Sequence, residues 1–135
     1  DQEEFGRSAD EILQFLGLWS QRDEVAQNLP HGHLRALGIA IGLATEPKIL
    51  LLDEPFAGMN HDETVKAVEM VRAVRDRGVT VLLVEHDMPA VMNISDRIVV
   101  INFGQKIAEG TPRQIQENEK VIEAYLGAED ETIGY

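Results

Sequence analysis

The sequence contains no cysteine among its 135 residues. This excludes disulfides, thiolate metal sites and a cysteine nucleophile, and it fits a reducing compartment without proving one. Long hydrophobic runs are missing as well, since runs such as 49–52 contain four aliphatic residues, whereas a helix that spans a bilayer needs roughly 20. We therefore expect any association with a membrane to go through a partner, with no direct insertion.

Basic residues are scarce relative to acidic ones. The chain has 12 Lys and Arg against 24 Asp and Glu, which gives a formal net charge of -12. Nucleic acids and anionic lipids are usually bound through clustered Lys and Arg, so no nucleic-acid partner is expected. The length and ordinary apolar content suggest one domain or part of one. Because the chain opens without Met, in the acidic run 1–4, we expect it to be a piece of a longer protein.

The first 46 residues are predicted to be mainly helical. Ser8 and Glu11 fit a capping box ahead of apolar residues at helical spacing, which predicts a helix over 9–19. A second, largely buried helix is expected over 34–44. Two glycines in it cost about 1 kcal/mol each relative to alanine, so we expect them to mark close packing. They are Gly38 and Gly42.

The middle of the chain alternates between strand and helix patterns. The apolar runs 49–52 and 79–84 are typical of parallel strands covered on both faces. Strand, helix, strand, helix, strand predicts right-handed crossovers and a parallel sheet, so the fold class is α/β. The other expected elements are helices over 61–77 and 88–94, strands over 97–102 and 106–109, and a terminal helical region from Thr111-Pro112 to about Leu126, followed by a frayed tail.

Two carboxylates follow directly on the first apolar run. Asp53 and Glu54 stand before Pro55, at the carboxyl end of the predicted strand, where open parallel sheets place their ligands. Asp53 could hold Mg2+, while Glu54, on the opposite face of the strand, could polarise an attacking water. The alternative is a strand that ends in two solvated acids. Four preceding aliphatic residues and the following proline favour the functional interpretation.

A histidine follows the second apolar run. His86 stands between Glu85 and Asp87. At the end of a neighbouring parallel strand, its imidazole would lie beside the first site and could bind a terminal phosphate or orient the water. A histidine in such a place is more often a surface residue, but the pairing with the first motif favours a role in chemistry.

A third motif, Leu29, Pro30, His31, Gly32 and His33, reads as a loop immediately before a helix. Backbone N–H groups at Gly32 and along the first helical turn could point at an anion, which the helix dipole also favours. Two alternatives stay open. The two histidines could be half of a metal site, although no third ligand with suitable spacing follows, or the segment is an ordinary loop with a cap.

Taken in order, these motifs resemble the ATP-binding-cassette nucleotide-binding domains, particularly those of branched-chain amino acid uptake systems. The resemblance runs from about Ala9 to Gly127 and includes 104–112 and 121–127. It implies a P-loop-NTPase-like parallel sheet with flanking helices, truncated on the N-terminal side. It also implies a division into a helical and signature part over 1–46, a sheet core from the Walker B strand to the switch histidine over 47–110, and a C-terminal helix and tail over 111–135.

The resemblance also implies residue roles. Asp53 would be the magnesium residue, Glu54 the catalytic base and His86 the switch histidine. Residues 29–33 would be the signature loop, which contacts the ATP of a second subunit. The D-loop, which crosses the dimer interface, would be Ala57, Gly58, Met59 and Asn60.

The implied cofactors are ATP and Mg2+. The implied partners are a second nucleotide-binding subunit, identical or not, and transmembrane permease subunits. Such a protein would sit peripherally at the cytoplasmic face of the cell membrane.

Some residues depart from the family pattern. Pro30 replaces the signature serine and His33 the glutamine, while Gly38 and Ile41 stand where many members carry Glu and Arg. The signature half-site is therefore expected to be weakened. No G-x-x-x-x-G-K-[ST] phosphate loop occurs in the sequence. We expect the chain alone neither to bind ATP measurably nor to hydrolyse it.

Three functions follow from the sequence. The first is the C-terminal portion of the ATP-hydrolysing subunit of an importer, and the second is a non-catalytic regulatory or interaction half-domain. The third, a soluble ATP-binding-cassette protein of DNA repair or translation, fits poorly with the charge of -12. A sheet without its first strands would expose an edge, so oligomers or swapped dimers are also expected.

Overall fold

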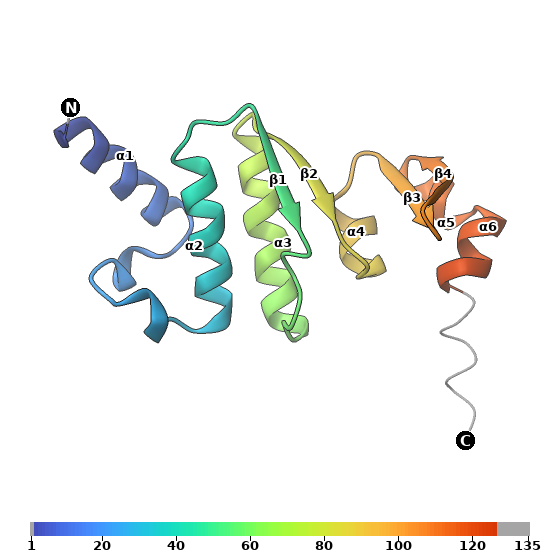
Figure 1. The fold of residues 1–135 in the computed structure, drawn as a ribbon, viewed down its shortest axis with the longest axis horizontal. Coiled ribbons are helices and arrows are strands. Elements are labelled where there is room, and N and C mark those ends of the chain that lie inside the picture. Colours follow the sequence, from blue (N-terminus) through green and yellow to red (C-terminus); the bar gives the residue numbers. More distant parts are fainter. Residues whose placement is uncertain (1, 127–135) are drawn as a thin grey trace, which may run out of the picture. The chain divides into compact units, whose positions relative to one another are not determined.

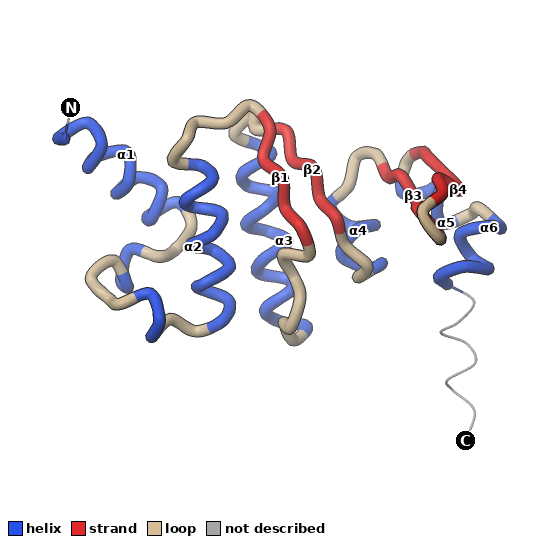
Figure 2. Tube along the Cα trace, in the orientation of Figure 1, coloured by secondary structure: helices blue, strands red, loops and turns tan. Residues whose placement is uncertain are grey.

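The computed structural model describes residues 2–126 (Figures 1 and 2). It divides into two compact units, an N-terminal unit that ends at His86 and a C-terminal unit that begins at Asp87. Among residues 2–126, none of the helices combines the length and the hydrophobicity that a bilayer crossing requires.

The N-terminal unit contains three helices and a pair of strands (Figure 1). Two single turns of 3-10 helix, Trp19–Gln21 and Ala26–Asn28, join the first two helices. The main elements are α1 (Gln2–Phe15), α2 (His31–Leu43), β1 (Ile49–Asp53), α3 (His61–Asp76) and β2 (Thr80–Val84).

β1 and β2 pair in parallel, as predicted. Ile49 lies opposite Thr80 and Asp53 opposite Val84, so the two strands end at the same edge. The connection between them is α3, which closes at Gly78, a glycine with a φ of 94°. The predicted strand, helix, strand crossover is confirmed.

One face of this strand pair is packed and the other is not. Leu50 of β1 is buried, together with four residues of α3. The prediction that both strands are covered on both faces is wrong for the described residues, because alternate side chains are exposed. They are Ile49, Leu51, Leu82 and Val84.

α1 begins earlier than predicted. Ser8 lies inside the helix, so the expected capping box with Glu11 is wrong. The helix also ends earlier, at Phe15 rather than Trp19. Gly17 has a φ of 72°, and the N–H groups of Gly17 and Leu18 donate to carbonyl groups of the last turn in the pattern of a Schellman motif. A glycine that adopts the left-handed conformation therefore sets this boundary.

α2 is less buried than predicted. Its buried residues are Ala36, Ile39 and Ala40, whereas Ile41 is 65% exposed. Gly42 does mark close packing, because a Cβ there would lie 2.7 Å from Cδ1 of Leu50. At Gly38 the same prediction is wrong, since no atom of the described chain lies within 4 Å of an added Cβ.

The two glycines of α2 give a matched test. Gly38→Ala is expected to raise the free energy of unfolding by up to about 1 kcal/mol, because alanine costs less than glycine inside a helix. Gly42→Ala is expected to lose that gain, since the new methyl group meets the buried Leu50 side chain. Urea unfolding of both variants measures the difference. Equal stabilisation by the two substitutions would show that a methyl group at position 42 does not crowd the Leu50 side chain.

The C-terminal unit is a hairpin with short helices around it. Its elements are α4 (Met88–Ile94), β3 (Ile98–Asn102), β4 (Gln105–Gly110), α5 (Pro112–Gln116), α6 (Glu119–Val121) and a π-helical turn, Ile122–Leu126. The predicted helix over 88–94 is confirmed. The core consists of Ile98, Val100, Ala108, Ile115 and Val121.

The third predicted strand does not join the parallel pair. β3 and β4 form an antiparallel pair, and β1 and β2 form a separate two-stranded sheet. The antiparallel strands are joined by Phe103 and Gly104, a two-residue connection in which both residues have positive φ, 47° and 75°. That backbone conformation matches the twist of an antiparallel hairpin.

An acidic side chain of β4 bonds the residue that directly precedes β3, as well as a lysine of its own strand. The Glu109 carboxylate accepts hydrogen bonds from Lys106 Nζ at 2.8 Å and from Arg97 Nη2 at 2.7 Å. The hydrogen bond from Lys106, followed by that from Arg97, lowers the pKa of Glu109 to about 2. The stabilisation from this cluster is therefore present at neutral pH and is lost only as the pH falls toward 2.

The terminal helical region is broken rather than continuous. Thr111 forms the predicted N-terminal cap, in a capping box with Gln114. The helix stops at Gln116, and the Asn118 side chain accepts hydrogen bonds from the N–H groups of the next turn. The predicted frayed tail lies outside the described residues.

Candidate functional site

The site begins where β1 ends. Glu54 follows Asp53, and its N–H donates to the carbonyl oxygen of Val84 at 2.8 Å, which extends the pairing of the two strands by one residue. Glu54 has a φ of 46°, a left-handed conformation that is uncommon for a residue with a side chain. It is therefore the first residue of a turn, and the prediction that it occupies the opposite face of the strand is wrong. Backbone strain of this kind is frequent at functional sites.

The structure brings Glu54 and His86 together, as the sequence predicted. Nδ1 of His86 lies 3.6 Å from Oε1 of Glu54. This distance is too long for a hydrogen bond. The side chains are 72% and 55% exposed respectively, so both can reach a bound molecule. An exposed pair of this kind contributes little to stability.

Glu85 joins the two turns, a contact that the sequence analysis missed. Its Oε1 accepts the N–H of Phe56 at 2.9 Å, and its Oε2 accepts the N–H of His86 at 3.1 Å. Phe56 is two residues beyond Glu54, and its side chain is buried. The only signal in the sequence was a carboxylate beside His86 at a strand end. One carboxylate therefore connects the turn after β1 with the turn after β2.

The predicted loop 29–33 is shorter than expected. His31, Gly32 and His33 form the first turn of α2, and Pro30 is the N-cap residue without a side-chain cap. The first hydrogen bond of the helix runs from Leu34 N–H to the Pro30 carbonyl. The N–H groups before Leu34 therefore have no acceptor within the helix and can bind an anion at its N-terminus.

The start of α2 contacts the segment 57–60. Nε2 of His31 lies 2.9 Å from the carbonyl oxygen of Ala57. A carbonyl oxygen only accepts, so this contact requires a proton on Nε2 of His31. Gly58 has a φ of 76°, and a Cβ there would lie 3.3 Å from the same nitrogen. Two of the predicted segments therefore meet within one chain.

Asn60 fixes the other end of the segment 57–60. Its side chain accepts the N–H of Glu63, whose carboxylate in turn accepts the N–H of Asn60, each at 3.0 Å. This capping box starts α3. This cap was not predicted from the sequence.

We expect Asn60→Ala to lower the free energy of unfolding by about 1 kcal/mol, because the helix loses its N-cap acceptor. Asn60→Asp keeps an oxygen acceptor and should retain most of the stability. Thermal or urea unfolding measures both. If Asn60→Ala matched the unsubstituted protein, the capping box would not hold the segment.

Asp53 is exposed at the end of β1. Among residues 2–126, no group of three or more His, Cys, Asp or Glu side chains could hold a metal ion. Mg2+ in nucleotide sites needs only one or two carboxylates, because waters and substrate phosphates supply the other ligands. Asp53 therefore fits an ion that arrives with a nucleotide, whereas the described residues build no complete protein cage.

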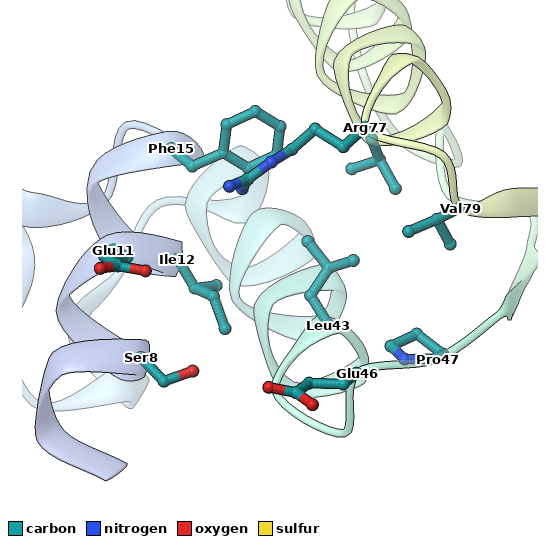
Figure 3. Close-up of a pocket in the computed structure, with 10 residues that line it drawn as sticks. Ser8, Glu11, Ile12, Phe15, Leu43, Glu46, Pro47, Arg77 and Val79 are labelled. Carbon is teal, nitrogen blue, oxygen red and sulfur yellow. The ribbon is translucent and has the colours of Figure 1, made fainter. Parts of the chain in front are cut away.

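A separate hollow of about 290 Å3 lies where α1, the end of α2 and the end of α3 meet (Figure 3). Arg77 lies over the ring of Phe15, 4.3 Å from its centroid. Glu11 and Glu46 also line the hollow. None of the predicted site residues lines it.

Two family models match the chain. That of the ABC transporter covers residues 1–57, and that of the branched-chain amino acid ATP-binding cassette transporter covers residues 105–131.

The relatives with similar sequences include two branched-chain amino acid transport proteins. A high-affinity branched-chain amino acid transport ATP-binding protein, LivG of Escherichia coli K12, is 48% identical over 116 residues, which are 85% of this chain and 46% of the relative. A probable branched-chain amino acid transport ATP-binding protein of Archaeoglobus fulgidus is 39% identical over 133 residues, which are 98% of this chain and 52% of the relative. The chain thus spans about half the length of the curated relatives that it matches.

A solved structure agrees with these matches. The crystal structure of an ATP-binding cassette of an ABC transporter, in its ADP conformation, superposes with a TM-score of 0.85 at 33% identity. The similarity covers 94% of this chain and 52% of that one. The predicted α/β fold of the P-loop-NTPase type is confirmed.

Proposed function

We propose that this chain is a member of the ABC transporter family, as its family-model match and its relatives indicate, and that it forms the C-terminal part of the ATP-hydrolysing subunit of an importer for branched-chain amino acids. The observation that carries the catalytic part of the proposal is the 3.6 Å separation of Glu54 and His86, at the edge where two parallel strands end. The names of the relatives support the substrate class.

The proposed chemistry divides between three side chains. Glu54 accepts a proton from the attacking water and so orients it toward the terminal phosphate. His86 donates a hydrogen bond to a phosphate oxygen or to the same water. Asp53 would hold Mg2+, and the ion, when bound, neutralises charge on the phosphates. All three residues lie where β1 and β2 end, so a single phosphate group could reach them.

The other two segments would serve a second subunit. In the proposed dimer, the N-terminus of α2 and the segment 57–60 face the ATP of the partner subunit. The N–H groups of the first turn, which have no acceptor within the helix, and the helix dipole suit a phosphate there. Pro30 and His33 supply neither the serine hydroxyl nor the glutamine amide of the common signature loop. This half-site would bind mainly through its backbone.

Partners and location follow from the same proposal. The subunit would pair with a second nucleotide-binding subunit and dock on permease subunits at the cytoplasmic face of the membrane. Opening and closing of that pair would couple hydrolysis to transport. The 135-residue chain alone would be inactive, since its sequence holds no phosphate loop.

The test compares Mg-ATP binding and turnover by this chain and by a version extended upstream to include a phosphate loop. We expect turnover from the extended version only. Glu54→Gln should lower kcat by roughly 100-fold or more while ATP still binds, because the general base is lost. Glu69→Gln, on the exposed surface of α3, is the matched control and should leave the rate unchanged.

Two outcomes would count against the proposal. Steady turnover by the 135-residue chain, abolished by Glu54→Gln, would show that it needs no upstream phosphate loop. Absence of turnover from both versions would favour a second candidate, a regulatory half-domain that binds a complete ATPase. The departures at Pro30, His33 and Ile41 are the observation behind that candidate.

A further inference from the structure

The carboxylate of Glu85 uses its two oxygens on two different turns. Oε1 accepts the Phe56 N–H at 2.9 Å, and Oε2 accepts the His86 N–H at 3.1 Å. The first bond joins residues 29 positions apart in the sequence and is partly buried. Hydrogen bonds to an ionised acceptor are roughly twice as strong as neutral ones. The carboxylate therefore forms a strong connection between the end of β1 and the end of β2.

The turn that carries Glu54 is held at several points. The N–H of Glu54 donates to the Val84 carbonyl, and the Glu54 carbonyl accepts the N–H of Ala57 at 3.2 Å. Phe56 is 4% exposed, so its side chain anchors the turn in the core. Glu85 adds the bond to the Phe56 backbone. These contacts keep Glu54 in a left-handed conformation that it would rarely adopt alone.

The side chains of Glu54 and His86 have no such support. They are 55% and 72% exposed, and they do not reach hydrogen-bond distance of each other. Packing therefore does little to set their separation, and the backbone from which each side chain extends must do it. Glu85 is bonded to the backbone on both sides of this pair.

We propose that Glu85 is a positioning residue, whose carboxylate clamps the two turns and so sets the distance between Glu54 and His86 for ATP hydrolysis. This role rests on the proposed function above. Glu85 would not touch the nucleotide. It would act through the backbone of Phe56 and His86.

The carboxylate differs from an amide in a way that makes the clamp testable. Glu85→Ala removes both acceptors, whereas Glu85→Gln keeps one acceptor oxygen and turns the other position into a donor. One of the two N–H groups must then lose its partner. We expect activity to be highest in the unsubstituted protein, lower in Glu85→Gln and lowest in Glu85→Ala. Glu69→Gln, a change of the same chemistry on the exposed face of α3, serves as the control.

The experiment measures two quantities in the full-length subunit. Amide hydrogen-exchange rates, measured by NMR, report on the N–H groups of Phe56 and His86. Steady-state kinetics gives kcat and KM for ATP. We expect Glu85→Ala to speed exchange at both amides and to lower kcat by roughly 10- to 100-fold, since small misplacements of catalytic groups have effects of this size. KM should change little, because ground-state binding of ATP does not use the clamp.

Unchanged exchange at both amides in Glu85→Ala would overturn the proposal, because the bonds would then be absent in solution. Faster exchange with an unchanged kcat would overturn it as well, since the contact would be structural only. If the unsubstituted subunit did not turn over ATP, the proposed function would fail on its own. The exchange data would then still decide whether Glu85 clamps the two turns.

Discussion

The parallel pairing of β1 with β2 is the constraint on which the rest of the N-terminal unit depends. Its register places Asp53 opposite Val84, and the N–H of Glu54 continues the ladder by one further bond. Because both strands run in the same direction and end together, the residues that follow them share one edge. A slip of one residue would move every side chain to the other face of the sheet and would separate Glu54 from His86.

The same edge also carries contacts that are local to this chain. His31, at the start of α2, bonds the Ala57 carbonyl, and the Asn60 capping box fixes the other end of that segment. The start of α2 and the segment 57–60 are therefore coupled before any second subunit binds. In the proposed dimer, they would move together toward the partner's nucleotide. The catalytic edge and the partner-facing edge thus depend on one turn, which runs from Glu54 to Asn60.

Local patterns predicted much of this structure. Apolar runs and periodic spacing located β1, β2, α3 and α4, and the residues after two parallel strands gave Glu54 and His86. Features that depend on distant segments were missed. Exposure of Leu51 depends on what lies against the sheet, and the role of Glu85 depends on a backbone group 29 residues away. The antiparallel pairing of β3 with β4 was also missed, because it depends on the two-residue turn at Phe103 and Gly104, whereas the alternation of strands and helices suggested a parallel sheet.

We propose that Glu54 and His86, which lie 3.6 Å apart, work as one unit on one reaction. A double-mutant cycle in the full-length subunit tests it most directly, with single-turnover ATP hydrolysis measured for Glu54→Gln, for His86→Ala and for the two combined. Groups that act together give strongly non-additive losses. We predict that the double variant is about as slow as the slower single variant. If the fold-losses in rate of the two single variants multiply in the double variant, the two side chains act independently and the proposal is wrong.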